Sequence, residues 1–122
     1  NICSNQALNA LAASVAMTAL GKKGVKEIAW QNLQKAAYAK EAAKRAGLEV
    51  VFDGPMFNEF VVRLNEPVEK ANERLLEKNI IGGYDLGASY RDLKQHMLIA
   101  VTELRTREEI DTLMNELGDR HE

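Results

Sequence analysis

The sequence contains one cysteine, two histidines, two prolines and eight glycines among its 122 residues. A single cysteine cannot form an internal disulfide, so nothing points to an oxidising compartment. The few prolines and glycines rule out a collagenous or low-complexity chain. No run approaches the ~18 apolar residues of a membrane span. Lys and Arg number 16 against 18 Asp and Glu, and this balance gives no electrostatic reason to expect nucleic acid or an anionic membrane as a partner.

The chain also lacks a methionine at position 1 and begins Asn1-Ile2-Cys3-Ser4. The opening has no basic segment followed by an apolar run, so it does not resemble a signal peptide. The length, with 46% hydrophobic and 28% charged residues, is typical of one globular domain. We therefore expect residues 1–122 to be a single domain cut from a longer polypeptide.

Two helices are predicted in the first 46 residues. Residues 5–20 carry alanine, leucine and valine at helical spacing with little polar surface, and Ser4 or Asn5 is expected to cap them. This helix should pack on more than one side, in part against a missing domain or partner. Gly21 separates it from a second helix over 24–46, which Gly47 is expected to end.

A hairpin and a third helix follow. Strands are predicted over 48–52 and 57–64, with turn residues between them. The third helix is expected to be capped by Asn65 and to turn Leu75 and Leu76 inward.

The last part of the chain is predicted to hold a strand and a helix. A short extended piece at 80–81 leads into a glycine-rich loop over 82–87, and a strand follows over 96–101. Thr106 and Glu109 form the sequence signature of a capping box at the start of the last helix. The buried stripe of that helix is predicted to be Ile110, Leu113, Met114 and Leu117.

This order of elements predicts an α+β fold. We expect a small mixed or antiparallel sheet of three to four strands, covered by helices on one face.

No catalytic constellation emerges from the residue types. The loop over 82–87 matches neither a phosphate-binding loop nor a dinucleotide fingerprint, so a plain turn is favoured over a ligand-facing or interface loop. Cys3 is far in sequence from His96 and His121, and a nucleophilic Cys–His pair needs a base within hydrogen-bond reach. No group of residues has the spacing of zinc ligands.

Several further features have a structural and a functional interpretation. The basic cluster Lys22, Lys23 and Lys26 is expected to be solvated, and Phe52, Phe57 and Phe60 are expected in the core. Trp30 is either a core residue or a contact to a missing part. The segment 102–105, with Glu103 and Arg105, either faces a substrate or is a surface turn with a local ion pair.

Three segments resemble the P-protein of the glycine cleavage system. They are Asn1-Ile2-Cys3-Ser4-Asn5-Gln6-Ala7-Leu8, Phe52-Asp53-Gly54-Pro55-Met56-Phe57-Asn58-Glu59-Phe60, and Ile80-Ile81-Gly82-Gly83-Tyr84-Asp85-Leu86-Gly87 with Leu98-Ile99-Ala100-Val101-Thr102-Glu103. The resemblance covers essentially the whole chain. It is strongest to the C-terminal small domain of subunit 1 in the bacterial two-subunit form, a cytoplasmic heterotetramer.

The resemblance implies a parent enzyme of the fold-type-I pyridoxal phosphate (PLP) class. That enzyme decarboxylates glycine through PLP and transfers the aminomethyl group to the lipoyl arm of H-protein. PLP is expected on subunit 2, and no cofactor, metal or catalytic residue is expected in this chain, which should be inactive alone. Its expected partners are its own large domain, subunit 2 and lipoylated H-protein.

The resemblance also assigns interface or active-site-facing loops within the chain. Residues 1–20 are expected to link the two domains. The residues of the two loops are Asn1, Ile2, Cys3 and Ser4, and Gly82, Gly83, Tyr84 and Asp85. Backbone geometry explains the glycines equally well, because glycine tolerates positive φ.

Two other interpretations stay open at this point. One is the small domain of another fold-type-I PLP enzyme, such as an aminotransferase or cysteine desulfurase. Many of those enzymes place an arginine at the end of the third strand, and here none occurs before Arg105. A free-standing α+β binding module is the other alternative, and the alanine-rich opening helix disfavours it.

Overall fold

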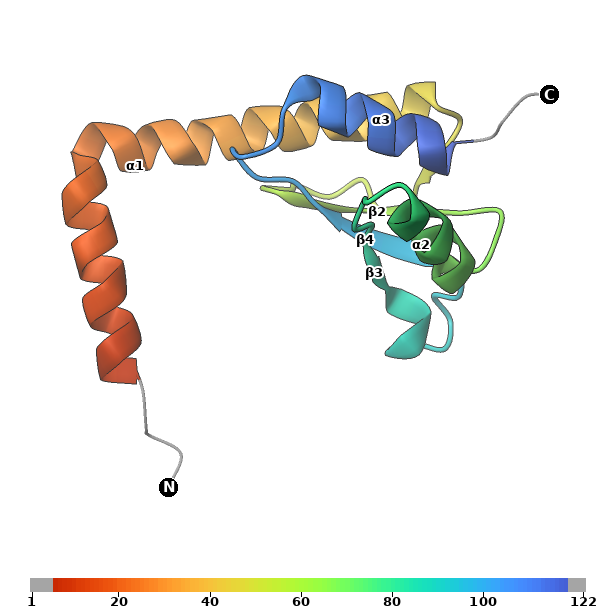
Figure 1. Ribbon diagram of the computed structural model, residues 1–122, viewed down its shortest axis with the longest axis horizontal. Coiled ribbons are helices and arrows are strands. Elements are labelled where there is room, and N and C mark those ends of the chain that lie inside the picture. Colours follow the sequence, from red (N-terminus) through yellow and green to blue (C-terminus); the bar gives the residue numbers. More distant parts are fainter. Residues whose placement is uncertain (1–5, 119–122) are drawn as a thin grey trace.

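The computed structural model describes residues 6–118. Its elements are α1 (Gln6–Arg45), β1 (Glu49–Val50), β2 (Glu59–Arg63), α2 (Val68–Glu77), β3 (Tyr84–Asp85), the short 3-10 helix η1 (Leu86–Ala88), β4 (His96–Ala100) and α3 (Arg107–Leu117). A long bent helix leads into a layered domain of sheet and helices (Figure 1). The predicted α+β class is confirmed.

The sheet has four antiparallel strands in the order β1-β2-β4-β3. The predicted hairpin is present as the β1–β2 pair, although both strands are shorter than the sequence indicated. The extended piece predicted at 80–81 is not a strand. The fourth strand forms instead inside the glycine-rich segment, where Tyr84 and Asp85 pair with Leu98 and Met97.

One face of the sheet carries the core, as predicted. Phe60 and Val62 pair in register with Ile99 and Met97, so all four side chains point to the same face. Helices α1 and α3 lie side by side over this face (Figure 1). Helix α2 joins the same core near β3 through Val68, Ala71 and Leu75.

Small side chains let α1 approach the domain closely. Ala36, Ala39 and Ala43 are fully buried in the shared core. Alanine adds little bulk between a helix and its neighbour, so the backbone of α1 comes near the sheet and α3. The C-terminal part of α1 is therefore a structural part of the domain.

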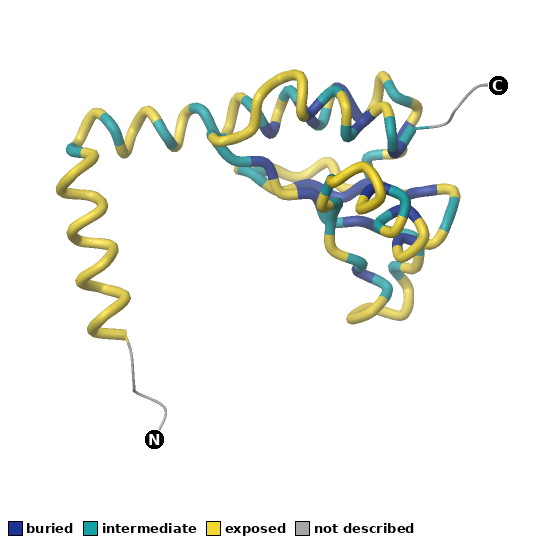
Figure 2. The backbone as a smooth tube through the Cα atoms, viewed as in Figure 1, coloured by how far each residue is buried: buried dark blue, intermediate teal, exposed yellow. Residues whose placement is uncertain are grey.

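The N-terminal part of α1 forms an arm, which we define as residues 6–20. Gly21 has φ 67° and ψ 173°, a conformation open essentially to glycine alone, and the helix bends there. The predicted separation of two helices at Gly21 is confirmed. The arm projects from the domain and is exposed along its whole length (Figures 1 and 2).

Two helices end by the same backbone device. Gly47 has φ 83°, and the N–H groups of Gly47 and Leu48 donate to the carbonyls of Lys44 and Ala43. These two bonds form the motif in which a left-handed residue satisfies the last carbonyls of a helix, and they confirm Gly47 as the predicted stop. Asn79, with φ 59°, ends α2 in the same way.

Four sequence predictions are wrong in detail. Phe52 and Phe57 are 54% and 50% exposed, because β1 ends at Val50 and both rings lie in the connecting loop. Leu76 is 65% exposed, because its neighbour Leu75 takes the core-facing position and successive helical residues point in different directions. Asn65 is not the cap of α2; Pro67 occupies that position, without a side-chain cap.

The other core predictions are largely confirmed. Phe60 is buried, and so are Ile110, Met114 and Leu117 of α3, whereas Leu113 packs against the core while remaining half-buried.

Candidate interaction surface

The described residues offer surface features and no enclosed polar site. No polar or charged residue in the range 6–118 is buried. In that range no group of three or more His, Cys, Asp or Glu is placed to hold a metal ion. None of the helices described is long and apolar enough to cross a membrane.

Gly82 and Gly83 fasten the glycine-rich loop to α2 and β4. The Asn72 Nδ2 donates a hydrogen bond of 3.0 Å to the Gly83 carbonyl. A Cβ on Gly82 would overlap the Asn72 amide and lie 2.7 Å from the Leu75 Cδ1. Neither glycine has positive φ, so the backbone explanation offered by the sequence is wrong here. These positions need glycine for space.

The residues that follow close the loop on itself. The Tyr84 and Ser89 hydroxyls lie 2.7 Å apart, and Asp85 accepts a 2.8 Å hydrogen bond from the Gly87 N–H. The Asp85 carboxylate thereby caps η1. Tyr84 stays 54% exposed, so its ring is available to a neighbour.

The glycine-rich loop and the segment 102–105 flank one cleft. The cleft has a volume of about 310 Å³, and Ile81, Gly82, Ile99 and Leu113 contribute to its walls. Arg105 also lines it. The cleft is mostly apolar and brings together two segments that sequence analysis had considered separately.

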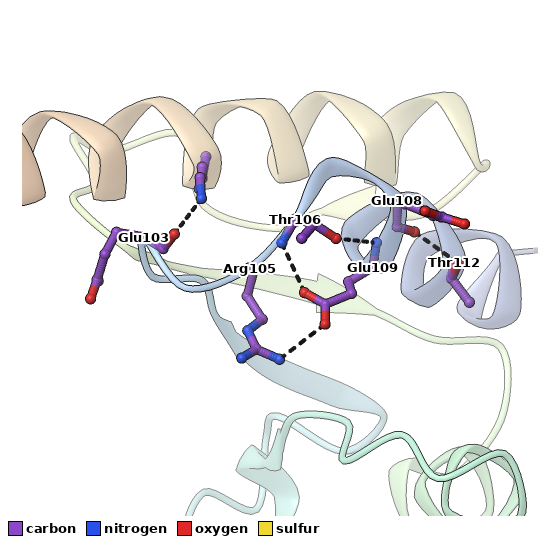
Figure 3. Close-up of polar contacts among 7 residues, drawn as sticks. Glu103, Arg105, Thr106, Glu108, Glu109 and Thr112 are labelled. Atoms are coloured by element: carbon purple, nitrogen blue, oxygen red, sulfur yellow. Dashed lines mark hydrogen bonds and ion pairs between the residues drawn. The ribbon is translucent and has the colours of Figure 1, made fainter.

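The segment 102–105 is a turn held by α1. The Glu103 N–H donates to the Asn32 Oδ1 at 2.6 Å, and the Lys35 ammonium donates to the Glu103 carbonyl. The Arg105 N–H closes the turn by donating to the Thr102 carbonyl. Arg105 pairs with Glu109 at 3.6 Å (Figure 3). The ion pair suggested within this segment therefore does not form between Glu103 and Arg105.

The predicted capping box at the start of α3 is confirmed. Thr106 Oγ1 accepts from the Glu109 N–H at 3.2 Å, and the Thr106 N–H donates to the Glu109 carboxylate at 2.8 Å (Figure 3). The backbone bond from Thr106, together with the nearby Arg105, lowers the pKa of Glu109 below its usual value. The box fixes the direction in which the turn enters α3.

A polar cluster between α1 and α3 was missed by sequence analysis. The Tyr38 hydroxyl donates to Asp111 at 2.6 Å and accepts from the Arg107 Nε at 2.9 Å. The Arg107 guanidinium also lies 4.7 Å from the centroid of the Tyr38 ring. The hydrogen bond raises the pKa of Arg107. No local signal could reveal this cluster, because Tyr38 lies about 70 residues from Arg107 and Asp111 in the chain.

The residues described do not fit a PLP site. A Schiff-base lysine needs an enclosed cleft in which its amine meets the cofactor. Every lysine in the described range is exposed or half-buried. Lys35 and Lys40 are the half-buried ones in that range, and the Lys35 ammonium donates to a backbone carbonyl in a structural contact. No chemical step is therefore assigned to this cofactor within the chain.

The remaining residues singled out from the sequence lie outside the described range or on the surface of the domain. Asn1, Ile2, Cys3, Ser4 and His121 lie outside the described residues, as does the proposed cap at Asn5. His96 is half-buried at the start of β4, with its Nδ1 2.8 Å from the Lys94 carbonyl. Trp30 is 56% exposed, and Lys22, Lys23 and Lys26 are exposed.

The fold and these features define a small α+β domain with an apolar arm and surface loops suited to contacts with other protein. The family model for the glycine cleavage system P-protein matches residues 1–117. The chain belongs to the glycine cleavage system P-protein family.

Individual relatives agree with this family. The chain is 94% identical over all its 122 residues to a Bacillus licheniformis protein named probable glycine dehydrogenase (decarboxylating) subunit 1, and 75% identical to the Bacillus subtilis protein of that name. It covers 27% of each. A crystal structure of glycine decarboxylase (P-protein) in inhibitor-bound form matches 96% of this chain and 26% of its own, with 28% identity and a TM-score of 0.82.

The chain thus spans about a quarter of the length of the curated relatives it matches. Membership of the P-protein family separates it from the aminotransferase and cysteine desulfurase alternative.

Proposed function

We propose that this chain is a structural and interaction domain of a bacterial glycine dehydrogenase (decarboxylating), within its subunit 1. The observation that carries the proposal is the 94% identity over the whole chain to a protein named as that subunit. No polar or charged residue in the range 6–118 is buried as a whole, which favours a structural role over a catalytic one.

The parent enzyme would act in the cytoplasm on glycine, with subunit 2 and lipoylated H-protein as partners in a heterotetramer. PLP, held on subunit 2, would supply the electron sink for decarboxylation. Within subunit 1, residues 1–20 would link this domain to a large domain. The loop over Gly82–Asp85 would contribute to an interface.

The exposed apolar residues of the arm support its role as a link to a large domain. Leu11 and Val15 are each 60% exposed and Leu8 is 67% exposed, although all three are strongly apolar. Apolar patches of this kind on a protein usually mark a surface that contacts another protein. We infer that the rest of the subunit 1 polypeptide covers the arm.

The function is tested with purified proteins. The parent subunit 1, combined with subunit 2, PLP and lipoylated H-protein, should exchange labelled carbon dioxide with the carboxyl group of glycine. Residues 1–122 alone should show no exchange and no PLP absorbance. Absence of exchange in the complete mixture, or activity from the chain alone, would contradict the proposal.

The arm is tested separately by Leu11→Asp. In residues 1–122 alone, the exposed position should leave the urea midpoint unchanged. In the parent subunit the same substitution should bury an unpaired carboxylate and cost several kcal/mol, on the order of 3–5, seen as lost solubility or a lower unfolding midpoint. Equal effects in the two proteins would show that the arm stays exposed.

A further inference from the structure

Within the turn over 102–105, the backbone of Glu103 is fixed by hydrogen bonds with another element. Glu103 is fixed through both of its backbone polar groups by side chains of α1, its N–H by Asn32 and its carbonyl by Lys35. Two side chains about 70 residues away in the chain thus fix the position of this one residue. The capping box that follows fixes the other end of the turn.

The Glu103 carboxylate itself has no partner within residues 6–118. Its backbone groups are bonded, but no hydrogen bond or ion pair is found for its side-chain oxygens in that range. Arg105, the nearest basic residue along the chain, binds Glu109 instead, and the Glu103 side chain points away from both of them (Figure 3). The Lys35 ammonium is bonded to the Glu103 backbone carbonyl.

Two exposed apolar side chains belong to the turn and to the loop next to it. Leu104, the next residue, is 70% exposed, and Phe57 is 50% exposed. The Val101 N–H donates to the Asn58 carbonyl at 2.8 Å, so the loop that carries Phe57 runs alongside the end of β4, where the turn begins. A carboxylate held in one position near exposed apolar side chains can pair with a cation of an incoming protein surface, and charge pairs of this kind fix the register of a contact.

We propose that Glu103 anchors this domain to the rest of the subunit 1 polypeptide by binding an arginine or lysine side chain there, with Leu104 packing beside the pair. The proposal rests on the proposed function and goes further by naming a residue and the chemistry of its partner. Leu104 is 70% exposed, so the pair lies at the solvated edge of the contact, where added salt weakens it.

The position of the turn favours the chain's own polypeptide as the partner. The segment between β4 and α3 lies at the end of the domain nearer the arm (Figure 1). The part of the subunit 1 polypeptide that covers the arm therefore approaches the same end of the domain. The relatives contain about three-quarters of their length beyond the matched part, which is enough for such a part.

The test uses Glu103→Gln in the parent subunit 1, measured without subunit 2. Glutamine keeps the size and both backbone hydrogen bonds and removes only the charge. The thermal midpoint should fall by about 2 °C or more at low ionic strength, and most of that difference should vanish in about 1 M salt. Glu77→Gln, an exposed glutamate on α2 away from the turn, is the matched control and should shift the midpoint by less than about 1 °C.

Three results would overturn the anchor. One is equal midpoints for Glu103→Gln and Glu77→Gln in the parent subunit. Another is an equal loss from Glu103→Gln in residues 1–122 alone, which would place the effect inside the domain. The third is a loss that appears only after subunit 2 is added, which would place the cation on that subunit.

Failure of the proposed function is distinguishable from failure of the anchor. If the wild-type assembly shows no glycine-dependent carbon dioxide exchange but Glu103→Gln still lowers the midpoint, the function is wrong and the anchor stands. If exchange is present and the midpoint is unaffected, the anchor alone is wrong.

Discussion

Replacing Gly83 by alanine should loosen β3 from the sheet. A Cβ there would overlap the Leu98 carbonyl oxygen and lie 2.5 Å from the Met97 Cγ. The Met97 side chain can move, but the Leu98 carbonyl belongs to the backbone of β4, which is paired on both sides. Relief therefore requires β3 to move away, and β3 is held to β4 by only the Tyr84 and Asp85 pairs.

The size of the effect follows from this contact. Forcing extra bulk into a closely packed site costs about 1–3 kcal/mol. With a urea dependence of roughly 1–3 kcal/mol per molar for a small domain, a cost of about 2 kcal/mol lowers the midpoint of unfolding by roughly 1 M. The measurement is urea unfolding of residues 1–122, followed by circular dichroism.

Gly54→Ala is the matched control for this prediction. A Cβ on Gly54 would meet nothing within 4 Å, and its φ is not in the left-handed region. Alanine there should be neutral or should stabilise the chain by about 0.4–1 kcal/mol, because it restricts the unfolded state. If Gly83→Ala and Gly54→Ala gave the same midpoint, the close packing of Gly83 against β4 would be refuted.

Two further predictions concern the start of α3. Thr106→Ala removes the cap and should destabilise residues 1–122 by about 1 kcal/mol in urea unfolding, whereas Thr106→Ser should keep the bond; equal midpoints for the two variants would contradict the cap. The pKa of Glu109 is lower in the folded state than in the unfolded state. The ionised Glu109 carboxylate therefore stabilises the fold at a pH above the ordinary carboxyl pKa. This contribution is lost as the pH falls through the pKa of the folded state. Comparing urea midpoints at about pH 7 and about pH 3, Glu109→Gln should therefore show a smaller acid-induced loss than the wild type, and an unchanged loss would count against this assignment.

Local signals in the sequence predicted three helix boundaries correctly. Gly21, Gly47 and the Thr106–Glu109 capping box each act within a few residues, and each appears where it was expected. The α+β class followed from the order of such elements. Patterns of this kind depend on backbone sterics and nearby hydrogen bonds, so tertiary contacts are not needed to predict them.

Features that depend on distant contacts could not be predicted. The glycine-rich loop was interpreted through backbone freedom, but Gly82 is packed against Asn72 and Gly83 against β4. The burial of Phe52 and Phe57 was expected because both are aromatic and were predicted to lie on adjacent strands. Their exposure depends on where the ladder between β1 and β2 stops, which the local sequence does not reveal.

The placement of the hydrophobic residues says more about function than their number does. The 46% hydrophobic content is ordinary, so composition alone gives no sign of a missing partner. The structure divides that content unevenly: the core face of the sheet is closed by three helices, whereas Leu8, Leu11 and Val15 of the arm remain exposed. An apolar helix held away from its own core gains nothing from burial there, so its sequence is better explained by burial against another body. The Leu11→Asp comparison between the isolated chain and the parent subunit tests this explanation, and the Glu103→Gln comparison asks whether the same body reaches the turn after β4.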